Sequence, residues 1–537
     1  MWESIIEVVS KVNGIINGVV WGWPMIILIL GTGILITVRT KCMQVRKFGT
    51  SLGETIVPTV KSIGKKKKGQ NKKENSISQF EAFATAISGT VGTGNIVGVT
   101  SAIMTGGPGA VFWMWISAFF GMITNYAENV LGLYFRKREK DGGFSGGPAY
   151  YLSEGLGRGR KDALGSFLKT LGKILGVMAA VFCTFAAIGM SGVQTNKISV
   201  TFQGAIGGNE KTIALIVGLV VSAVLALIIL GGIKSIGRVA AIIVPFMSLL
   251  FILMALIIIF ANITMLGTAF ALIFGNIFKF ESALAGVGGY AFAQIIQKGL
   301  ARGVFSNEAG LGSSVIAHSA SEVREPVKQG LWGIFEVFFD TFVICTLTAL
   351  LILVSFGDKA GMAGVLYAEG AADTAVSMMA LENMFGTFGT VVYSIMLPLF
   401  AFTTILAWSY YGEKSVDFLF RKTGDLGRKI ATTVFKVAYV LLVIVAALID
   451  GELAWAISDT FNGLMALPNL IGLVLMSGLL VRITKNYFDR KKGLDVKPML
   501  SMYEDLNAEF EQDILALAYE NDEESPSQEF AESAKED

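Results

Sequence analysis

The sequence predicts an all-α polytopic membrane protein with about 11 transmembrane helices. Of its 537 residues, 53% are hydrophobic and only 16% are charged, whereas soluble domains are about 25% charged. Apolar runs at 20–38, 212–231 and 239–260 are each close to the ~20 residues that span a bilayer as a helix. Composition and run length therefore both indicate that lipid is the solvent of this chain.

Eleven apolar segments account for the predicted helices. They lie near 18–38, 79–105, 109–135, 172–200, 212–232, 238–261, 283–303, 330–356, 386–412, 431–449 and 454–482. The loops 39–76, 136–173, 413–429 and 482–492 are basic, whereas "MTGGPG" and "LIDGEL" carry no Lys or Arg. Because basic loops stay cytoplasmic, we expect the N-terminus outside and the C-terminus inside, which requires an odd number of spans.

The chain divides into three parts. Residues 1–78 hold an N-terminal segment expected in the membrane interface, the first transmembrane helix and a basic cytoplasmic loop. Glu3 and Glu7 argue against a signal peptide there. Residues 79–490 form the core. Residues 491–537 form an acidic cytoplasmic tail, which we expect to be solvated and disordered apart from a helical piece near "LNAEFEQDILALAYE".

Several chemistries are excluded. Cys42, Cys183 and Cys345 lie far apart and predict neither a disulfide framework nor a zinc site. The single histidine, His318, is expected at the surface or in a loop rather than in a proton relay. No GxxxxGK[ST] phosphate-binding loop occurs, so the chain is not itself a pump driven by nucleotide hydrolysis.

The ten helices after the first form two sets of five, repeat one at 79–262 and repeat two at 283–490. "TGNIVGVTSAI" and "PGAVFWMWISAFFGMITNYAEN" correspond in order to "GVFSNEAGLGSSVIAH" and "KQGLWGIFEVFFDTFVICT". Because five is odd, the second set enters the membrane from the opposite side. Inverted repeats are typical of secondary transporters, whose site lies near the midplane where two broken helices meet.

The stretch "SGTVGTGN" at 88–95 predicts the first broken helix. Gly89, Gly92 and Gly94 fall near mid-membrane, where irregular backbone is tolerated only if it faces a cavity. A break frees carbonyls that suit a small hard cation such as Na⁺, and it aims a half-helix N-terminus at an anion such as a carboxylate. Asn95 adds an amide with donor and acceptor capacity. The alternative is that these glycines only allow close helix packing.

Two motifs resemble a known family. "GGPGAVFWMWISAFFG", which follows "GTGNIVGV", and "GLARGVFSNEAGLGS" are similar to the signatures of the sodium:alanine symporter family, the alanine or glycine:cation symporters. The likeness extends over about residues 20–490. It implies a LeuT-like 5+5 inverted repeat with one extra N-terminal helix, and uptake of alanine or glycine driven by Na⁺, or by H⁺ in some members.

The resemblance also implies site residues. A cation would be bound by the carbonyls of Ser88 and Val91 and by the hydroxyls of Thr403 and Thr404, although these threonines have an alternative role as helix-to-helix contacts. The substrate would be bound by residues of the first break, the fourth helix and the ninth helix, namely Thr93, Gly94, Asn95, Gln194, Thr404 and Trp408. Trp408 would wall the cavity and limit side-chain size; the alternative is an interface anchor.

The second break has two possible positions. The preferred one, "AGVGGY", makes Gly288 and Gly289 substrate-binding and leaves Lys298 and Arg302 at the cytoplasmic end. The other, "FSNEAGLG", would bury both cations near mid-membrane at ~2.5 kcal/mol or more each. Three carboxylates also fall within predicted spans and are either proton or ion sites or paired structural groups that line the bundle: Glu128, Glu336 and Asp340.

The sequence therefore predicts a symporter that couples inward Na⁺ movement to uptake of a small neutral amino acid. The alternatives are an H⁺-coupled permease, and a sensor or channel on the same fold. We expect a multi-pass protein of the cell membrane, in a prokaryote the inner membrane. Apart from Na⁺ no cofactor is expected; the chain is not an enzyme and has no nucleic-acid partner.

Overall fold

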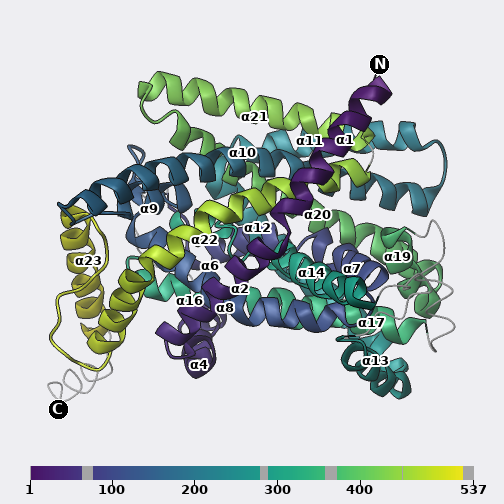
Figure 1. Cartoon of the computed structure of the whole chain (residues 1–537), viewed down its shortest axis with the longest axis horizontal. Helices are drawn as coiled ribbons and strands as arrows, with labels where there is room; N and C mark the ends of the chain where they lie inside the picture. The colour runs from purple at the N-terminus through teal and green to yellow at the C-terminus, as the bar shows by residue number, and fades with distance from the viewer. Residues whose placement is uncertain (1, 63–75, 279–287, 357–371, 450, 524–537) are drawn as a thin grey trace, which may run out of the picture.

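The computed structural model describes residues 2–62, 76–278, 288–356, 372–449 and 451–523 (Figure 1). These residues are almost entirely helical. Their β-structure consists of an isolated bridge between Ile77 and Ser321 and a short antiparallel hairpin. The hairpin is formed by β1 (Lys137–Arg138) and β2 (Phe144–Ser145), with Lys137 opposite Ser145. The predicted all-α class is confirmed.

The described residues form both long and short helices. The first half contains α1 (Trp2–Val20), α2 (Trp23–Arg39), α3 (Met43–Arg46), α4 (Phe48–Glu54), α5 (Ile56–Ser62), α6 (Gln79–Thr90), η1 (Gly94–Gly98), α7 (Val99–Gly106), α8 (Ala110–Tyr134), α9 (Pro148–Gly155), α10 (Ala163–Ile206), α11 (Glu210–Ile229), α12 (Gly232–Ala261) and α13 (Ile263–Gly275). The second half contains α14 (Gly288–Asn307), α15 (Ser314–Ser319), α16 (Pro326–Val337), η2 (Phe338–Cys345), α17 (Thr346–Ser355), α19 (Asp373–Phe385), α20 (Thr387–Leu419), α21 (Gly424–Leu448), α22 (Gly451–Arg490) and α23 (Glu504–Glu523). The η segments are π-helical.

Eight helices of the described residues are long and apolar enough to cross a membrane. Two bent pairs, α1 with α2 (40°) and α6 with η1–α7 (46°), raise this number to as many as ten. Each of the ten coincides with a predicted span, and the remaining prediction, 283–303, falls on α14 from Gly288 onward. The orientation of the termini stays a prediction.

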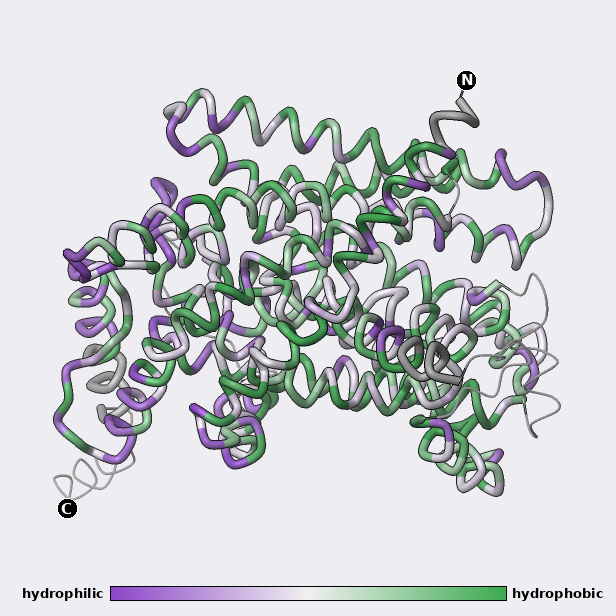
Figure 2. Tube along the Cα trace, in the orientation of Figure 1, coloured by the Kyte–Doolittle hydropathy of each residue, from purple (hydrophilic) through white to green (hydrophobic). Residues whose placement is uncertain are grey.

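The outward faces of the long helices are apolar. Leu227 of α11, Ile242 of α12 and Val434 of α21 are each more than half exposed. Figure 2 shows hydrophobic residues along these helices and hydrophilic residues gathered near α23, near α4 and at the turn between α10 and α11. A surface this apolar would aggregate in water, so it is suited to lipid.

Local sequence signals set several helix starts. Ser78 and Glu81 form a capping box at the start of α6, with the Glu81 carboxylate accepting from the Ser78 amide at 2.9 Å. Asp162 caps α10 through the Gly165 amide (2.9 Å). Prolines occur inside three long helices, at Pro245, Pro398 and Pro468. Membrane helices tolerate such prolines because neighbouring groups satisfy the freed backbone.

Helices of the two predicted repeats meet in the core. α8 packs along α16, and α6 packs against α15. The long helix α10 packs against both α20 and α22. In this arrangement η1 contacts both α14 and η2, so the predicted first break lies against the second repeat at the centre of the bundle.

The tail is packed rather than solvated from Leu500 to Phe510, whereas its first residues, 491–497, are exposed. Leu506 and Phe510 of α23 are buried against Phe144 of β2. Figure 1 shows α23 at the end of the molecule near α9. Arg324 binds the Asp513 carboxylate at 2.8 Å and lies 4.9 Å from the Phe510 ring centroid. The apolar positions of an otherwise acidic helix thus find partners on distant loops. Residues 524–537 lie outside the described residues.

Candidate functional site

The first broken helix lies where the sequence predicts it. α6 ends at Thr90, and the amide of Val91 still donates to the Ile87 carbonyl at 2.7 Å. The chain then turns, and η1 begins at Gly94. The Asn95 side chain accepts from the Gly92 amide at 2.9 Å and so satisfies a backbone group that the break has freed.

Several predicted site residues meet at this break. The Thr404 hydroxyl donates to the Ser88 carbonyl at 2.9 Å, across from α20 to α6. The Thr93 amide donates to the Gln194 side-chain oxygen of α10 at 3.3 Å. The Thr93 hydroxyl is buried and has no hydrogen-bond partner within the described residues. Helices α20 and α10 thus each contact a backbone group that the first break has freed.

Thr403 and Trp408 lie on the same helix, α20, but have different hydrogen-bond partners. The Thr403 hydroxyl faces carbonyls of its own helix, at Leu399 and Phe400, and the Met247 sulfur at 3.8 Å. Trp408 is fully buried, and its indole nitrogen donates to a Glu308 carboxylate oxygen at 2.9 Å. The interface-anchor alternative for Trp408 is therefore wrong.

The second break lies at "FSNEAGLG" and not at "AGVGGY", the position that the sequence favours. α14 ends at Asn307, and α15 begins at Ser314. Glu308 between them has a left-handed backbone (φ 54°). Gly288 and Gly289, the preferred candidates, instead begin the 20-residue α14, roughly 30 Å along its axis from the break. Of the preferred motif, residues 285–287 lie outside the described residues.

A distant partner removes the objection to this position for Arg302, one of the two cations concerned. Arg302 of α14 lies 3.3 Å from the Asp459 carboxylate of α22, and its guanidinium carbon is 4.7 Å from the Trp455 ring centroid. Both charged side chains are largely buried. Burying a charge in a membrane protein is expensive mainly when the charge is unpaired, so the ion pair offsets the cost that favoured the other position.

The two breaks meet at Asp340 of η2, which is fully buried. One carboxylate oxygen accepts from the Asn95 amide at 2.5 Å. The other accepts from the Ser306 hydroxyl at 2.9 Å and from the Thr341 hydroxyl at 2.8 Å. Within the described residues no Lys or Arg forms an ion pair with this carboxylate. Carboxylate and hydroxyl oxygens such as these are the ligands that hard cations prefer. The signal in the sequence was an acidic residue inside a predicted span.

The two other carboxylates that fall within predicted spans, Glu128 and Glu336, have hydrogen-bond partners away from the first break. Glu128 of α8 accepts from the Gly310 amide at 3.0 Å and from the Asn469 amide at 2.5 Å, so it fixes the loop of the second break. Glu336 is hydrogen-bonded to His318 at 2.9 Å. His318 lies on α15 and is fully buried, so the expectation of a surface or loop histidine is wrong.

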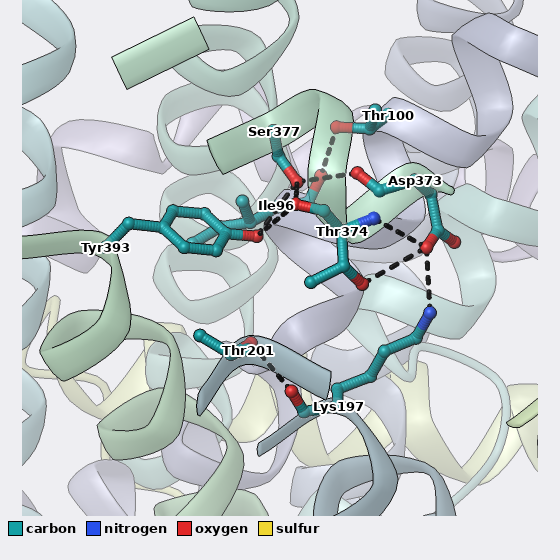
Figure 3. Close-up of polar contacts among 8 residues, drawn as sticks. All are labelled: Ile96, Thr100, Lys197, Thr201, Asp373, Thr374, Ser377 and Tyr393. Carbon is teal, nitrogen blue, oxygen red and sulfur yellow. Dashed lines mark hydrogen bonds and ion pairs between the residues drawn. The ribbon is translucent and has the colours of Figure 1, made fainter. Parts of the chain in front are cut away.

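An ion pair ties a further helix to this region. Lys197 of α10 lies 2.8 Å from Asp373, the first residue of α19, and the same carboxylate accepts from the Thr374 amide (Figure 3). Ser377 of α19 is hydrogen-bonded to Tyr393 of α20 at 2.9 Å (Figure 3). Because α19 packs against η1 and α7, these contacts hold it over the far half of the first broken helix.

The fold and its two broken helices define a secondary transporter with the LeuT-like architecture. The structure is similar to that of a Na⁺-coupled sialic acid symporter in a substrate-bound outward-open state, with a TM-score of 0.51 and 11% identity, over 91% of this chain and 96% of that one. The chain belongs to the sodium:alanine symporter family, whose model matches residues 6–500. The resemblance seen in the motifs is confirmed.

Two relatives extend over nearly the whole chain. The sodium/alanine symporter AgcS of Methanococcus maripaludis is 41% identical over 488 residues, which cover 91% of this chain and 99% of the relative. The probable sodium/glutamine symporter GlnT of Bacillus subtilis is 34% identical over 488 residues, 91% of this chain and 92% of the relative. A chain of this family is a multi-pass membrane protein that carries an amino acid with Na⁺, and it is not an enzyme.

Proposed function

We propose that this protein takes up a small neutral amino acid, alanine or glycine, by coupling it to inward Na⁺ movement through alternating access in the cell membrane. The observation that carries the proposal is the meeting of both helix breaks at Asp340, which binds Asn95 from the first break and Ser306 beside the second. Substrate and cation then share one region, so that either one stabilises the closed arrangement needed by the other.

The substrate carboxylate is assigned to the first break. The amides of Thr93 and Gly94 lie at the N-terminus of the π-helical half, where the helix dipole favours an anion. Gln194 already accepts from the Thr93 amide, and the Thr93 hydroxyl is buried without a partner in the described part of the chain. Trp408 limits the side chain. These contacts support a ligand with one carboxylate and little bulk.

The coupling cation has two candidate positions. The first comprises the Ser88 and Val91 carbonyls and the Thr404 hydroxyl, with Thr403 as a weaker candidate because its hydroxyl faces its own helix. The second is the Asp340 carboxylate with the side chains of Asn95, Ser306 and Thr341. A buried carboxylate could also carry H⁺, so H⁺ coupling is the second candidate mechanism.

Uptake of labelled alanine into proteoliposomes under an imposed Na⁺ or H⁺ gradient tests the proposal. We expect Na⁺ to drive uptake, and Asp340→Asn and Thr404→Val each to raise the Na⁺ concentration for half-maximal uptake. Thr348→Val is the matched control, because within the described residues this buried hydroxyl bonds only the Ile344 carbonyl, four residues earlier (3.0 Å). Uptake driven by H⁺ alone would show H⁺ coupling in place of Na⁺ coupling. Unchanged Na⁺ dependence in both variants would remove Asp340 and Thr404 from the cation site.

A further inference from the structure

Glu308 occupies an unusual backbone position in the second break. Its φ of 54° lies in the left-handed region, which non-glycine residues rarely adopt. Its amide donates to the Val304 carbonyl at 2.9 Å, and its carbonyl accepts from the Leu311 amide at 3.0 Å. Glycine, present two residues later, would adopt this conformation without strain. The presence of a glutamate at this strained backbone position therefore points to a role for its side chain.

The Glu308 side chain joins the second break to α20. One carboxylate oxygen accepts from the Trp408 indole nitrogen at 2.9 Å, and the other accepts from the Ser313 hydroxyl. All three side chains are buried. In the described part of the chain Glu308 forms no ion pair with a Lys or Arg. Its contacts are thus hydrogen bonds that fix geometry rather than a charge pair.

This contact fixes the orientation of the Trp408 ring. Indole has a single donor, and a buried indole normally finds an acceptor for it. The ring also lies edge-on to Tyr411, with centroids 5.5 Å apart. Trp408 is one helical turn from Thr404, whose hydroxyl contacts the first break at the Ser88 carbonyl. The spacing to Thr404 places Trp408 on the helix face that meets the proposed substrate region, and the hydrogen bond to Glu308 fixes how the ring is oriented there.

We propose that Glu308 is a positioning residue that sets the substrate size limit by holding Trp408 in place. The inference rests on the proposed function, in which Trp408 walls the substrate cavity. The glutamate acts through geometry: its acceptor oxygen holds the ring, and neither its charge nor direct substrate contact is required. A variant that keeps the acceptor should keep the size limit, and a variant without it should lose the limit.

Competition with labelled alanine uptake by glycine, alanine, serine, valine and leucine tests this role. We expect Glu308→Met, which keeps length but has no acceptor oxygen, to improve competition by valine and leucine relative to alanine about 10-fold or more. Glu308→Gln keeps an acceptor and should keep the ranking. Trp408→Phe should relax the ranking as Glu308→Met does, and the double variant should add little to either, because both remove one contact.

Trp332→Phe is the matched control. This tryptophan of α16 is also fully buried, and its indole nitrogen has no hydrogen-bond partner within the described residues. The ranking of competing amino acids in Trp332→Phe should equal that in the unmodified protein. The ranking is a ratio within one sample, so it does not depend on how much protein folds. If Glu308→Met yields no transport, Ser313→Ala, which removes the other support of the carboxylate, should shift the ranking in the same direction.

The outcomes separate this inference from the proposed function. A relaxed ranking in Trp408→Phe with an unchanged ranking in Glu308→Met overturns the positioning role alone. Equal shifts in Glu308→Gln and Glu308→Met also overturn it, because charge and not the acceptor would then matter. An unchanged ranking in Trp408→Phe overturns both the cavity wall and the inference. Absence of Na⁺-driven alanine uptake in the unmodified protein contradicts the proposed function itself.

Discussion

Gly92→Ala probes how closely the first break packs against α20. A methyl group here would overlap the Thr404 hydroxyl oxygen, and it would lie 3.4 Å from Thr404 Cβ and 3.5 Å from the Gln194 amide nitrogen. Gly92 is not among the glycines with a left-handed backbone. The substitution therefore acts through space and not through backbone strain, at a point where two proposed site residues meet.

Thr404 has little freedom to move away. Its β-branched side chain is restricted in a helix, and its hydroxyl donates toward the Ser88 carbonyl at 2.9 Å and the Phe400 carbonyl at 3.1 Å. Overpacking of this kind costs about 1–3 kcal/mol, which is roughly 5- to 150-fold in an equilibrium constant. We expect Gly92→Ala to raise the half-saturating concentrations of Na⁺ and of alanine by a factor in that range.

Gly98→Ala on the same broken helix is the matched control. Outside its own helix, the one described side chain that its methyl group would meet is Trp455, at the ordinary contact distance of 3.9 Å. Alanine uptake by proteoliposomes across a series of Na⁺ concentrations gives both half-saturation values. Equal values for the two variants would refute the reasoning that the space between Gly92 and Thr404 belongs to the site.

Three further predictions concern the surrounding structure. Phe510→Ala should release α23 at a cost of about 3–5 kcal/mol, seen as faster amide exchange over 504–514; unchanged protection would contradict the packing of the tail. Asp459→Asn should lower the Tm in detergent by leaving Arg302 unpaired, and adding Arg302→Met should recover part of the loss; no recovery would show that the pairing is unimportant. Burial alone would raise the pKa of the Glu154 carboxyl, but hydrogen bonds from Lys137 and Tyr503 outweigh it and the pKa is lowered. The stabilisation that Glu154 contributes is therefore present above the ordinary glutamate pKa and is lost as pH falls through the lower folded-state pKa. We expect the amide-exchange protection of α23 to fall with it, and Tyr503→Phe should make that protection less sensitive to acid.

The sequence alone determined the features that depend on local composition. Apolar run lengths located the spans, because a helix in lipid must be long, apolar and internally hydrogen-bonded. The glycines of 88–95 located the first break, since no other residue type favours irregular backbone so strongly at that depth. Long motifs identified the family, whose model matches residues 6–500. Each of these inferences needed only residues that are neighbours in the chain.

Tertiary structure decided every feature whose energy depends on a distant partner. The sequence predicts the wrong position for the second break because the cost of burying Arg302 depends on Asp459, which lies 157 residues away. Asp340 emerged as the meeting point of the breaks only when Asn95, 245 residues away, was placed beside it. His318 is buried because Glu336 and other polar groups surround it. A sequence shows that a polar side chain is present; the cost of burying it is set by the partners that the fold supplies.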